Sequence, residues 1–362
     1  MTAGTLVSIA ETWYVGYLGT MSLAGIALVF PCIMLQQMLS AGSMGGGISS
    51  AVSRALGAND LGKANALVLH AALICLGMGL FFTFVFIVWG EPIFRLLGGQ
   101  GEALVQSLAY ANVAFWGAAS IWLTNGFASV IRGSGNMKTP SLVLLIACVA
   151  QVTLSGVLGL GWGPIPSFGM AGIAMGYVIA FSASTLYLFA YLRSSRSMLR
   201  LSFKSPLSKP LFMDILKVGA MSSLSTLQTV ATILILTRLI SSFGPEALAG
   251  YGIGTRLEFL LVPMTFAFGV ACVPMVGMAL GAQLFERAKK VAWAGSLMSA
   301  ALIGGIGLLV TVWPGVWSEM FTSNTTVLFH AHQYFQWVGP CYGFFAIGLC
   351  LYFASQGAGK LL

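Results

Sequence analysis

The sequence predicts an all-α integral membrane protein with about ten transmembrane helices. Hydrophobic residues make up 58% of its 362 residues and charged residues only 7%, whereas soluble domains carry roughly 25% charged residues. Charge-free runs at 64–90, 103–131, 259–285 and 291–318 each exceed the ~20 residues that cross a bilayer once. The sustained alternation of apolar and polar residues that is typical of a membrane β-barrel is missing.

Longer charge-free runs at 12–53, 139–192 and 320–359 supply the remaining crossings. The run 139–192 holds two helices, because the turn-like segment 161–166 (Gly-Trp-Gly-Pro-Ile-Pro) divides it. The glycine-rich segment 42–47 lies within the second helix and lacks the Lys-Ser/Thr of a phosphate-binding loop, so we expect close helix packing or a hinge there. The expected helices, in order, are 1–18, 25–49, 65–89, 105–130, 140–160, 169–192, 213–241, 248–275, 289–313 and 331–356.

The basic residues predict the orientation in the membrane. Nearly all of them fall in loops or helix ends on one face, and Arg95 alone lies on the other. By the positive-inside rule the basic face is cytoplasmic, which places both termini there in a bacterial inner membrane. The net charge of +8 therefore reflects the membrane topology. Nucleic-acid binding is not expected, because it would need basic residues gathered on a soluble surface.

The chain is internally repeated. Leu-Ala-Gly at 23–25 returns at 248–250, and Leu-Gly-Ala at 56–58 returns at 280–282. In so apolar a chain, parallel halves indicate a transporter whose two bundles enclose a central site. We expect an N-terminal lobe of six helices at 1–192, a cytoplasmic linker at 193–212 and a C-terminal lobe of four helices at 213–362. A symmetric parent would have twelve helices, so we expect a chain shortened at both ends.

Neither a metal site nor an active site is expected. The six cysteines lie singly within predicted helices, and His70, His330 and His332 form no ligand cluster. No His-rich or Ser/His/Asp constellation at membrane depth supports a membrane-embedded enzyme. We therefore expect a transporter without a metal or other cofactor.

Several motifs together resemble the multidrug and toxic compound extrusion (MATE) family. Residues 11–19 read Glu-Thr-Trp-Tyr-Val-Gly-Tyr-Leu-Gly, similar to its first-helix signature, although the family usually has Asp in place of this Glu. The doubled Leu-Ala-Gly and Leu-Gly-Ala motifs and the segment 132–140 (Arg-Gly-Ser-Gly-Asn-Met-Lys-Thr-Pro) add to the likeness. The resemblance implies a two-lobe MATE-like helical bundle, a central V-shaped cavity, and export of small amphipathic, often cationic organic compounds in exchange for protons or sodium.

Glu11 is the residue that we expect to bind the coupling ion. A charge at membrane depth costs at least ~2.5 kcal/mol, so such a residue is usually retained for a task. By the resemblance, Gln151, Ser155 and Tyr177 occupy the positions that complete a first-lobe cation site in some members. Gln151 and Ser155 share one helix face and can converge on Glu11. With a single carboxylate the site favours H+, and Na+ is the alternative. Interhelical hydrogen bonds are the structural alternative for these residues.

The second lobe offers substrate-cavity candidates. Gln228 and Thr229 lie on the seventh expected helix, and Arg256 and Glu258 lie on the eighth. Arg256 and Glu258 are expected to form a structural pair, either with each other or with polar groups across the lobe. A contact with a substrate cation is the functional interpretation.

The sequence therefore predicts a secondary active multidrug exporter that works by alternating access, with small organic substrates and membrane lipids as its partners and a monomeric state. The nearest alternative is a flippase for lipid-linked oligosaccharides, which would line its cavity with several basic residues; only Arg238 and Arg256 are candidates. An inactive truncated remnant is the third hypothesis.

Overall fold

The computed structural model describes residues 2–163, 165–203 and 205–360, and the described residues form helices without a strand. The first half contains α1 (Thr2–Leu18), α2 (Thr20–Gln37), the π-helical η1 (Met38–Met44), α3 (Gly45–Gly57), α4 (Leu61–Leu96), α5 (Gly101–Trp116), α6 (Ala118–Gly133), α7 (Lys138–Leu160) and α8 (Gly169–Arg193). The second half contains α9 (Lys209–Ser241), α10 (Pro245–Gly281), α11 (Phe285–Val312), α12 (Gly315–Ser318), α13 (Thr325–Val338), the 3-10 helix η2 (Gly339–Cys341) and α14 (Tyr342–Ala358).

Eight helical stretches in the described part of the chain are long and apolar enough to cross a membrane. Two of them join several elements, because α2, η1 and α3 run on without a break, as do α13, η2 and α14. The other two predicted crossings correspond to α1, which has 17 residues, and to the pair α5 and α6, which is interrupted at Gly117. The predicted all-α membrane fold is confirmed.

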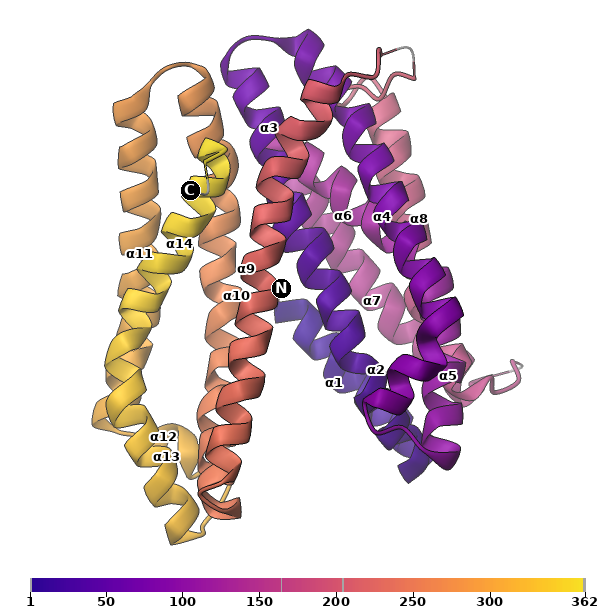
Figure 1. The fold of residues 1–362 in the computed structure, drawn as a ribbon, viewed down its shortest axis with the longest axis vertical. Coiled ribbons are helices and arrows are strands. Elements are labelled where there is room, and N and C mark those ends of the chain that lie inside the picture. Colours follow the sequence, from indigo (N-terminus) through magenta and orange to yellow (C-terminus); the bar gives the residue numbers. More distant parts are fainter. Residues whose placement is uncertain (1, 164, 204, 361–362) are drawn as a thin grey trace.

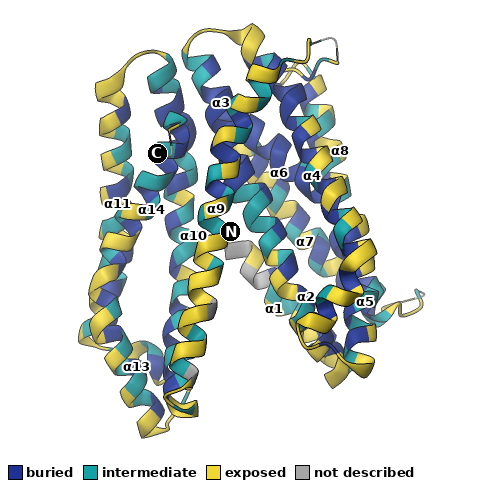
Figure 2. Cartoon of the chain, in the orientation of Figure 1, coloured by how far each residue is buried: buried dark blue, intermediate teal, exposed yellow. Residues whose placement is uncertain are grey.

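The helices form two bundles that meet toward one end and diverge toward the other (Figure 1). The largest buried apolar cluster runs from Tyr14 to Ile215, whereas two smaller clusters use residues from Ile253 onward. Burial is most complete in α3 and α6 of the first bundle (Figure 2). Each bundle therefore has apolar packing of its own, and α3 is the element that faces the second bundle.

The repeated Leu-Gly-Ala motifs form the crossing between α3 and α10. A Cβ atom at Gly57 would lie 2.2 Å from the carbonyl oxygen of Met278, and one at Gly281 would lie 2.2 Å from the carbonyl oxygen of Arg54. These pairs correspond to each other in the two repeats, so the contact is approximately two-fold symmetric. Glycine is required on both sides because only a residue without Cβ permits this approach of two backbones.

An ion-pair cluster of Arg54, Lys63 and Asp214 joins the bundles beside this crossing. Arg54 Nη2 lies 2.7 Å from Asp214 Oδ1, and Lys63 Nζ lies 3.0 Å from Asp214 Oδ2. Arg54 Nη1 also donates to Ser50 Oγ, which lies within hydrogen-bond reach of the backbone carbonyls of Gln356 and Gly357 and can donate to either. Charged and neutral hydrogen bonds therefore fasten α3 and α4 to α9 and α14.

The linker is shorter than predicted, and it packs against α4. Helix α9 begins at Lys209 rather than 213, since Pro210 favours the first turn of a helix. Leu199 and Leu201 of the linker are buried. The Ser208 N–H donates to His70 Nε2 over 3.0 Å. These contacts fix where α9 starts, and hence where Asp214 meets α3.

Candidate functional site

Glu11 on α1 accepts two hydrogen bonds from α7. Gln151 Nε2 lies 2.8 Å from Glu11 Oε1, and Ser155 Oγ lies 3.2 Å from the same oxygen. Both donors come from one face of α7 because they are four residues apart. The structure thus brings together three of the four residues expected to form the first-lobe cation site.

Close packing of α7 against α8 holds Ser155 in place. A Cβ atom at Gly176 would lie 2.4 Å from the Ser155 backbone nitrogen, so α8 approaches α7 at a glycine. Ser155 Oγ also lies 2.9 Å from the Ile173 carbonyl oxygen. A hydroxyl group has one hydrogen to donate, so Ser155 donates either to Glu11 or to Ile173 at any moment.

Aromatic side chains enclose the neighbouring turn of α1. Tyr14, one turn after Glu11, is buried and meets the Trp162 ring edge-on at 5.6 Å between ring centroids. Gly156 makes room for this pair, because a Cβ atom there would lie 2.9 Å from Trp162. The opposite side of α1 is open, since Trp13 is exposed.

Tyr177 belongs to a second polar cluster and has no described hydrogen bond with Glu11. Its hydroxyl accepts from Gln37 Nε2 over 2.9 Å. Asn125 Nδ2 donates to Gln37 Oε1 over 3.1 Å and to Ser40 Oγ over 2.8 Å. Gln37 and Asn125 were not predicted from the sequence, although a glutamine just before the glycine-rich segment of an apolar helix was a usable signal.

This second cluster surrounds the π-helical segment η1. Single π-helical turns inside α-helices are frequent at functional sites. Ser40 of η1 takes part in the cluster, and Ser43 lies 3.0 Å from Thr226 of α9 through their hydroxyl oxygens. Segment η1 therefore connects the polar interior of the first bundle to the second bundle.

The second-bundle candidates do not form one site. Glu258 accepts hydrogen bonds from Tyr334 and, over 3.4 Å, from Tyr342. Arg256 instead lies over the Phe321 ring at 5.2 Å from its centroid. No ion pair between the described residues joins Arg256 to Glu258, so of the two expected alternatives Glu258 follows the second, a contact with polar groups across the lobe. Residues two apart on a helix point in different directions.

Gln228 and Thr229 are exposed on α9. Thr229 Oγ1 donates to the Ser225 carbonyl oxygen, and the Gln228 carbonyl oxygen accepts from Thr232. In the part of the chain that the structure describes, no hydrogen bond connects either residue to Glu258. The described residues also contain no group of three or more His, Cys, Asp or Glu side chains that could hold a metal ion.

The chain matches one known protein family over most of its length. A family model described as MatE matches residues 1–157 and 222–362. The chain belongs to the MATE family. The resemblance predicted from the sequence is therefore confirmed, and this MATE protein is a transporter rather than an enzyme.

Several named relatives are similar to this MATE protein over much of its length. It is 24% identical to the probable multidrug resistance protein YoeA of Bacillus subtilis, over 88% of this chain and 69% of the relative. It is 25% identical to an FAD transporter of Shewanella oneidensis, over 78% of this chain and 63% of that protein. It is 27% identical to the multidrug export protein MepA of Staphylococcus aureus, over 71% of this chain and 57% of that protein. The chain thus spans between about half and about two thirds of these relatives.

Solved structures share the fold. A MATE structure in complex with MaD3S superposes with a TM-score of 0.91 at 23% identity, covering 100% of this chain and 80% of that one. A MOP superfamily transporter from Pyrococcus furiosus gives a TM-score of 0.90 at 22% identity, with the same coverage. This MATE protein therefore has the helical arrangement of these transporters.

Proposed function

We propose that this MATE protein is a secondary active exporter of small amphipathic organic compounds that exchanges them for protons. Family membership and the relatives named as multidrug proteins support the export of organic compounds. The pairing of Glu11 with Gln151 and Ser155 is the observation on which the proton coupling rests.

The Glu11 cluster can adapt to both protonation states. When Glu11 is ionised, Gln151 and Ser155 both donate to its oxygen. When Glu11 is protonated, its own O–H can donate to Ser155 Oγ, and Ser155 then donates to the Ile173 carbonyl oxygen. Binding a proton would therefore redirect the Ser155 hydroxyl hydrogen from Glu11 on α1 to the Ile173 carbonyl oxygen on α8.

The ligand set around Glu11 favours a proton over sodium. Hard cations prefer several oxygen ligands with compensating negative charge. Glu11 supplies one carboxylate and Ser155 one hydroxyl, but Gln151 presents its N–H group to the same oxygen. A sodium ion would need the amide to turn and further oxygens to approach.

The arrangement of the bundles supports alternating access. The bundles contact each other along α3, α10 and α14 and diverge toward the other end (Figure 1). We place the end of the molecule that carries the basic loops in the cytoplasm, by the positive-inside rule; the N-terminus lies near mid-height of the molecule rather than at this end (Figure 1). A membrane-impermeant thiol reagent should then label Ser195→Cys in the linker only from the cytoplasmic side, and labelling from outside would reverse the orientation.

Transport in proteoliposomes tests the coupling ion. Substrate movement is measured by dye fluorescence under an imposed pH gradient without sodium, and then under a sodium gradient at equal pH. We expect transport with the pH gradient alone and its loss when a protonophore collapses that gradient. Transport driven by sodium alone would assign Glu11 to a metal site instead.

A further inference from the structure

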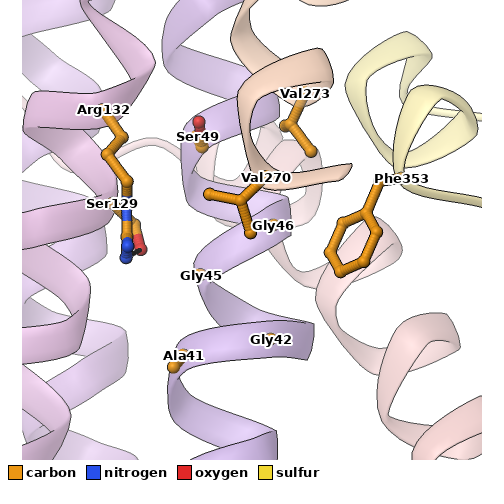
Figure 3. A pocket seen from close by; sticks show the side chains of 10 residues that line it. All are labelled: Ala41, Gly42, Gly45, Gly46, Ser49, Ser129, Arg132, Val270, Val273 and Phe353. Carbon is orange, nitrogen blue, oxygen red and sulfur yellow. Dashed lines mark hydrogen bonds between the residues drawn. The ribbon is translucent and has the colours of Figure 1, made fainter. Parts of the chain in front are cut away.

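A small hollow lies where the two bundles meet, away from Glu11. We call it the apex hollow. Its wall from the first bundle includes Gly45 and Ser49 of α3 and Ser129 and Arg132 of α6, and its wall from the second bundle includes Val273 of α10. Figure 3 shows the Arg132 side chain extended along α6, with its nitrogens beside the Ser129 hydroxyl. The hollow has room for about one oxygen-sized group.

Arg132 brings a positive charge without a described counter-charge. Its Nη2 donates to Ser129 Oγ over 3.1 Å, and no ion pair between the described residues includes it. A guanidinium carries five N–H donors, so most of them remain for another partner. The side chains across the hollow are apolar, and none of its lining residues is acidic. Arg132 is partly buried, and a cation withdrawn from water is costly without a neighbouring anion.

Ser49 brings a second group that lacks a partner. It is 5% exposed, and its Oγ has no hydrogen bond among the described residues. Buried hydroxyl groups are nearly always hydrogen-bonded, and leaving one unpaired costs free energy. Gly45 leaves the space beside Ser129 open, since a Cβ atom at this position would lie 2.7 Å from Ser129 Oγ.

We infer that the apex hollow binds one oxygen of a carboxylate or phosphate group on an anionic or zwitterionic amphipathic substrate. Arg132 supplies the charge and Ser49 supplies a free hydroxyl donor, while Ser129, which donates to the Asn125 carbonyl oxygen, holds the Arg132 side chain in place. Arginine is suited to this role because its planar fork matches carboxylate and phosphate geometry. The inference names a substrate class for the export function proposed above and rests on it, but the binding step does not depend on which ion drives transport.

The apex hollow is also connected to the polar interior of the first bundle. Ser129 Oγ donates to the Asn125 carbonyl oxygen over 2.7 Å, and the Asn125 amide bonds Gln37 and Ser40. An anion that drew Arg132 away from Ser129 would therefore act on a side chain of the same network. Binding of the anion would therefore change hydrogen bonds that reach Ser40 in the η1 segment.

Two dyes that differ at a single group test the inference. Rhodamine 110 carries a free carboxylate, and rhodamine 123 is its methyl ester. Binding of each to the purified full chain in detergent is measured by fluorescence polarisation, so no gradient is involved. We expect Arg132→Gln to weaken rhodamine 110 binding about tenfold, the size typical of one charged hydrogen-bond pair, and to change rhodamine 123 binding less than twofold.

Two further variants separate charge recognition from damage to the fold. Arg132→Lys should retain part of the preference, and Ser49→Ala should weaken rhodamine 110 binding about two- to threefold without lowering thermal stability. Equal weakening of both dyes by Arg132→Gln, or of neither, would overturn the inference. Displacement of rhodamine 110 by inorganic phosphate or by anionic lipid vesicles, but not by unlabelled carboxylate amphipaths, would also overturn the assignment to a substrate.

Discussion

At the scale of single residues, the shared hydrogen of Ser155 is the feature that distinguishes the Glu11 cluster from an ordinary interhelical contact. Its oxygen lies within reach of both Glu11 and Ile173, so the hydrogen-bond pattern depends on whether Glu11 carries a proton. A contact that served only packing would be the same in both protonation states.

Removing the titrating group should uncouple transport. Glu11→Gln keeps the size and one acceptor oxygen but cannot ionise, so we expect substrate binding within about threefold of wild type and loss of uphill export. Glu11→Asp should keep part of the export because it still titrates at a shorter reach. Proton release on substrate addition, measured with a pH dye, is the readout, and undiminished proton-driven export by the Gln variant would remove Glu11 from the coupling role.

The Glu258 cluster should contribute to stability. Tyr334→Phe removes the hydroxyl donor to this carboxylate, and the loss of a hydrogen bond to a charged group costs about 1–3 kcal/mol. Tyr342→Phe is the matched control, because its bond is long at 3.4 Å. We expect a larger decrease in melting temperature for Tyr334→Phe, and equal melting temperatures would show that the short contact adds no stability.

The nearness of Gln151 and Ser155 to Glu11 could be predicted, since two polar residues four apart must share a helix face. The partner of Tyr177 could not, because the sequence does not fix how α8 is rotated about its axis. Of the two partners expected for Glu258, the structure shows the polar groups across the lobe and not Arg256, because residues two apart on one helix point in different directions. Spacing along one helix was therefore enough to place Gln151 and Ser155 beside Glu11. Tertiary packing decided that Tyr177 joins a different polar cluster.

At the scale of elements, the crossing of α3 and α10 and the π-helical η1 decide how the bundles meet. The glycines of the crossing were visible in the sequence as a repeated motif. The π-helical turns were not, because they differ from α-helical turns only by one residue and leave no separate periodicity. The predicted start of α9 at 213 also lies after the observed start at Lys209, although Pro210 was a usable signal for the first turn.

A methyl group at the crossing should separate the bundles. Gly57→Ala would place its Cβ against the Met278 backbone, and such overpacking costs about 1–3 kcal/mol. Gly305→Ala is the control, because a Cβ atom there meets nothing within 4 Å. We expect Gly57→Ala to slow transport and to increase proteolysis at the α3–α4 turn, whereas Gly305→Ala should behave as wild type.

At the scale of the whole molecule, the ion-pair cluster of Arg54, Lys63 and Asp214 ties the two bundles at the end where they meet. One carboxylate serves two basic side chains from the other bundle, so its loss leaves both without this partner. The cluster lies on the predicted cytoplasmic face. With the orientation proposed above, it would stabilise an arrangement that is closed to the cytoplasm.

Neutralising Asp214 should shift the protein toward cytoplasmic opening. We expect Asp214→Asn to raise the labelling rate of Ser53→Cys from the cytoplasmic side about fivefold, in a background without the native cysteines, which corresponds to roughly 1 kcal/mol. Glu91→Gln is the control, because the Glu91–Arg95 pair is exposed and lies within one helix. An unchanged labelling rate in Asp214→Asn would show that packing alone holds this face closed.

The symmetric glycine crossing relates the two halves of the chain as if they were separate subunits. Where corresponding positions of two repeats touch each other, the contact is isologous, as between identical subunits of a dimer. Gly277 lies against Ser53, its own counterpart, as residues near such an axis must. A separate half-length polypeptide with these motifs would already possess the surface needed to bind its twin. The crossing thus has the geometry of a two-fold interface between identical subunits, although both halves belong to one chain.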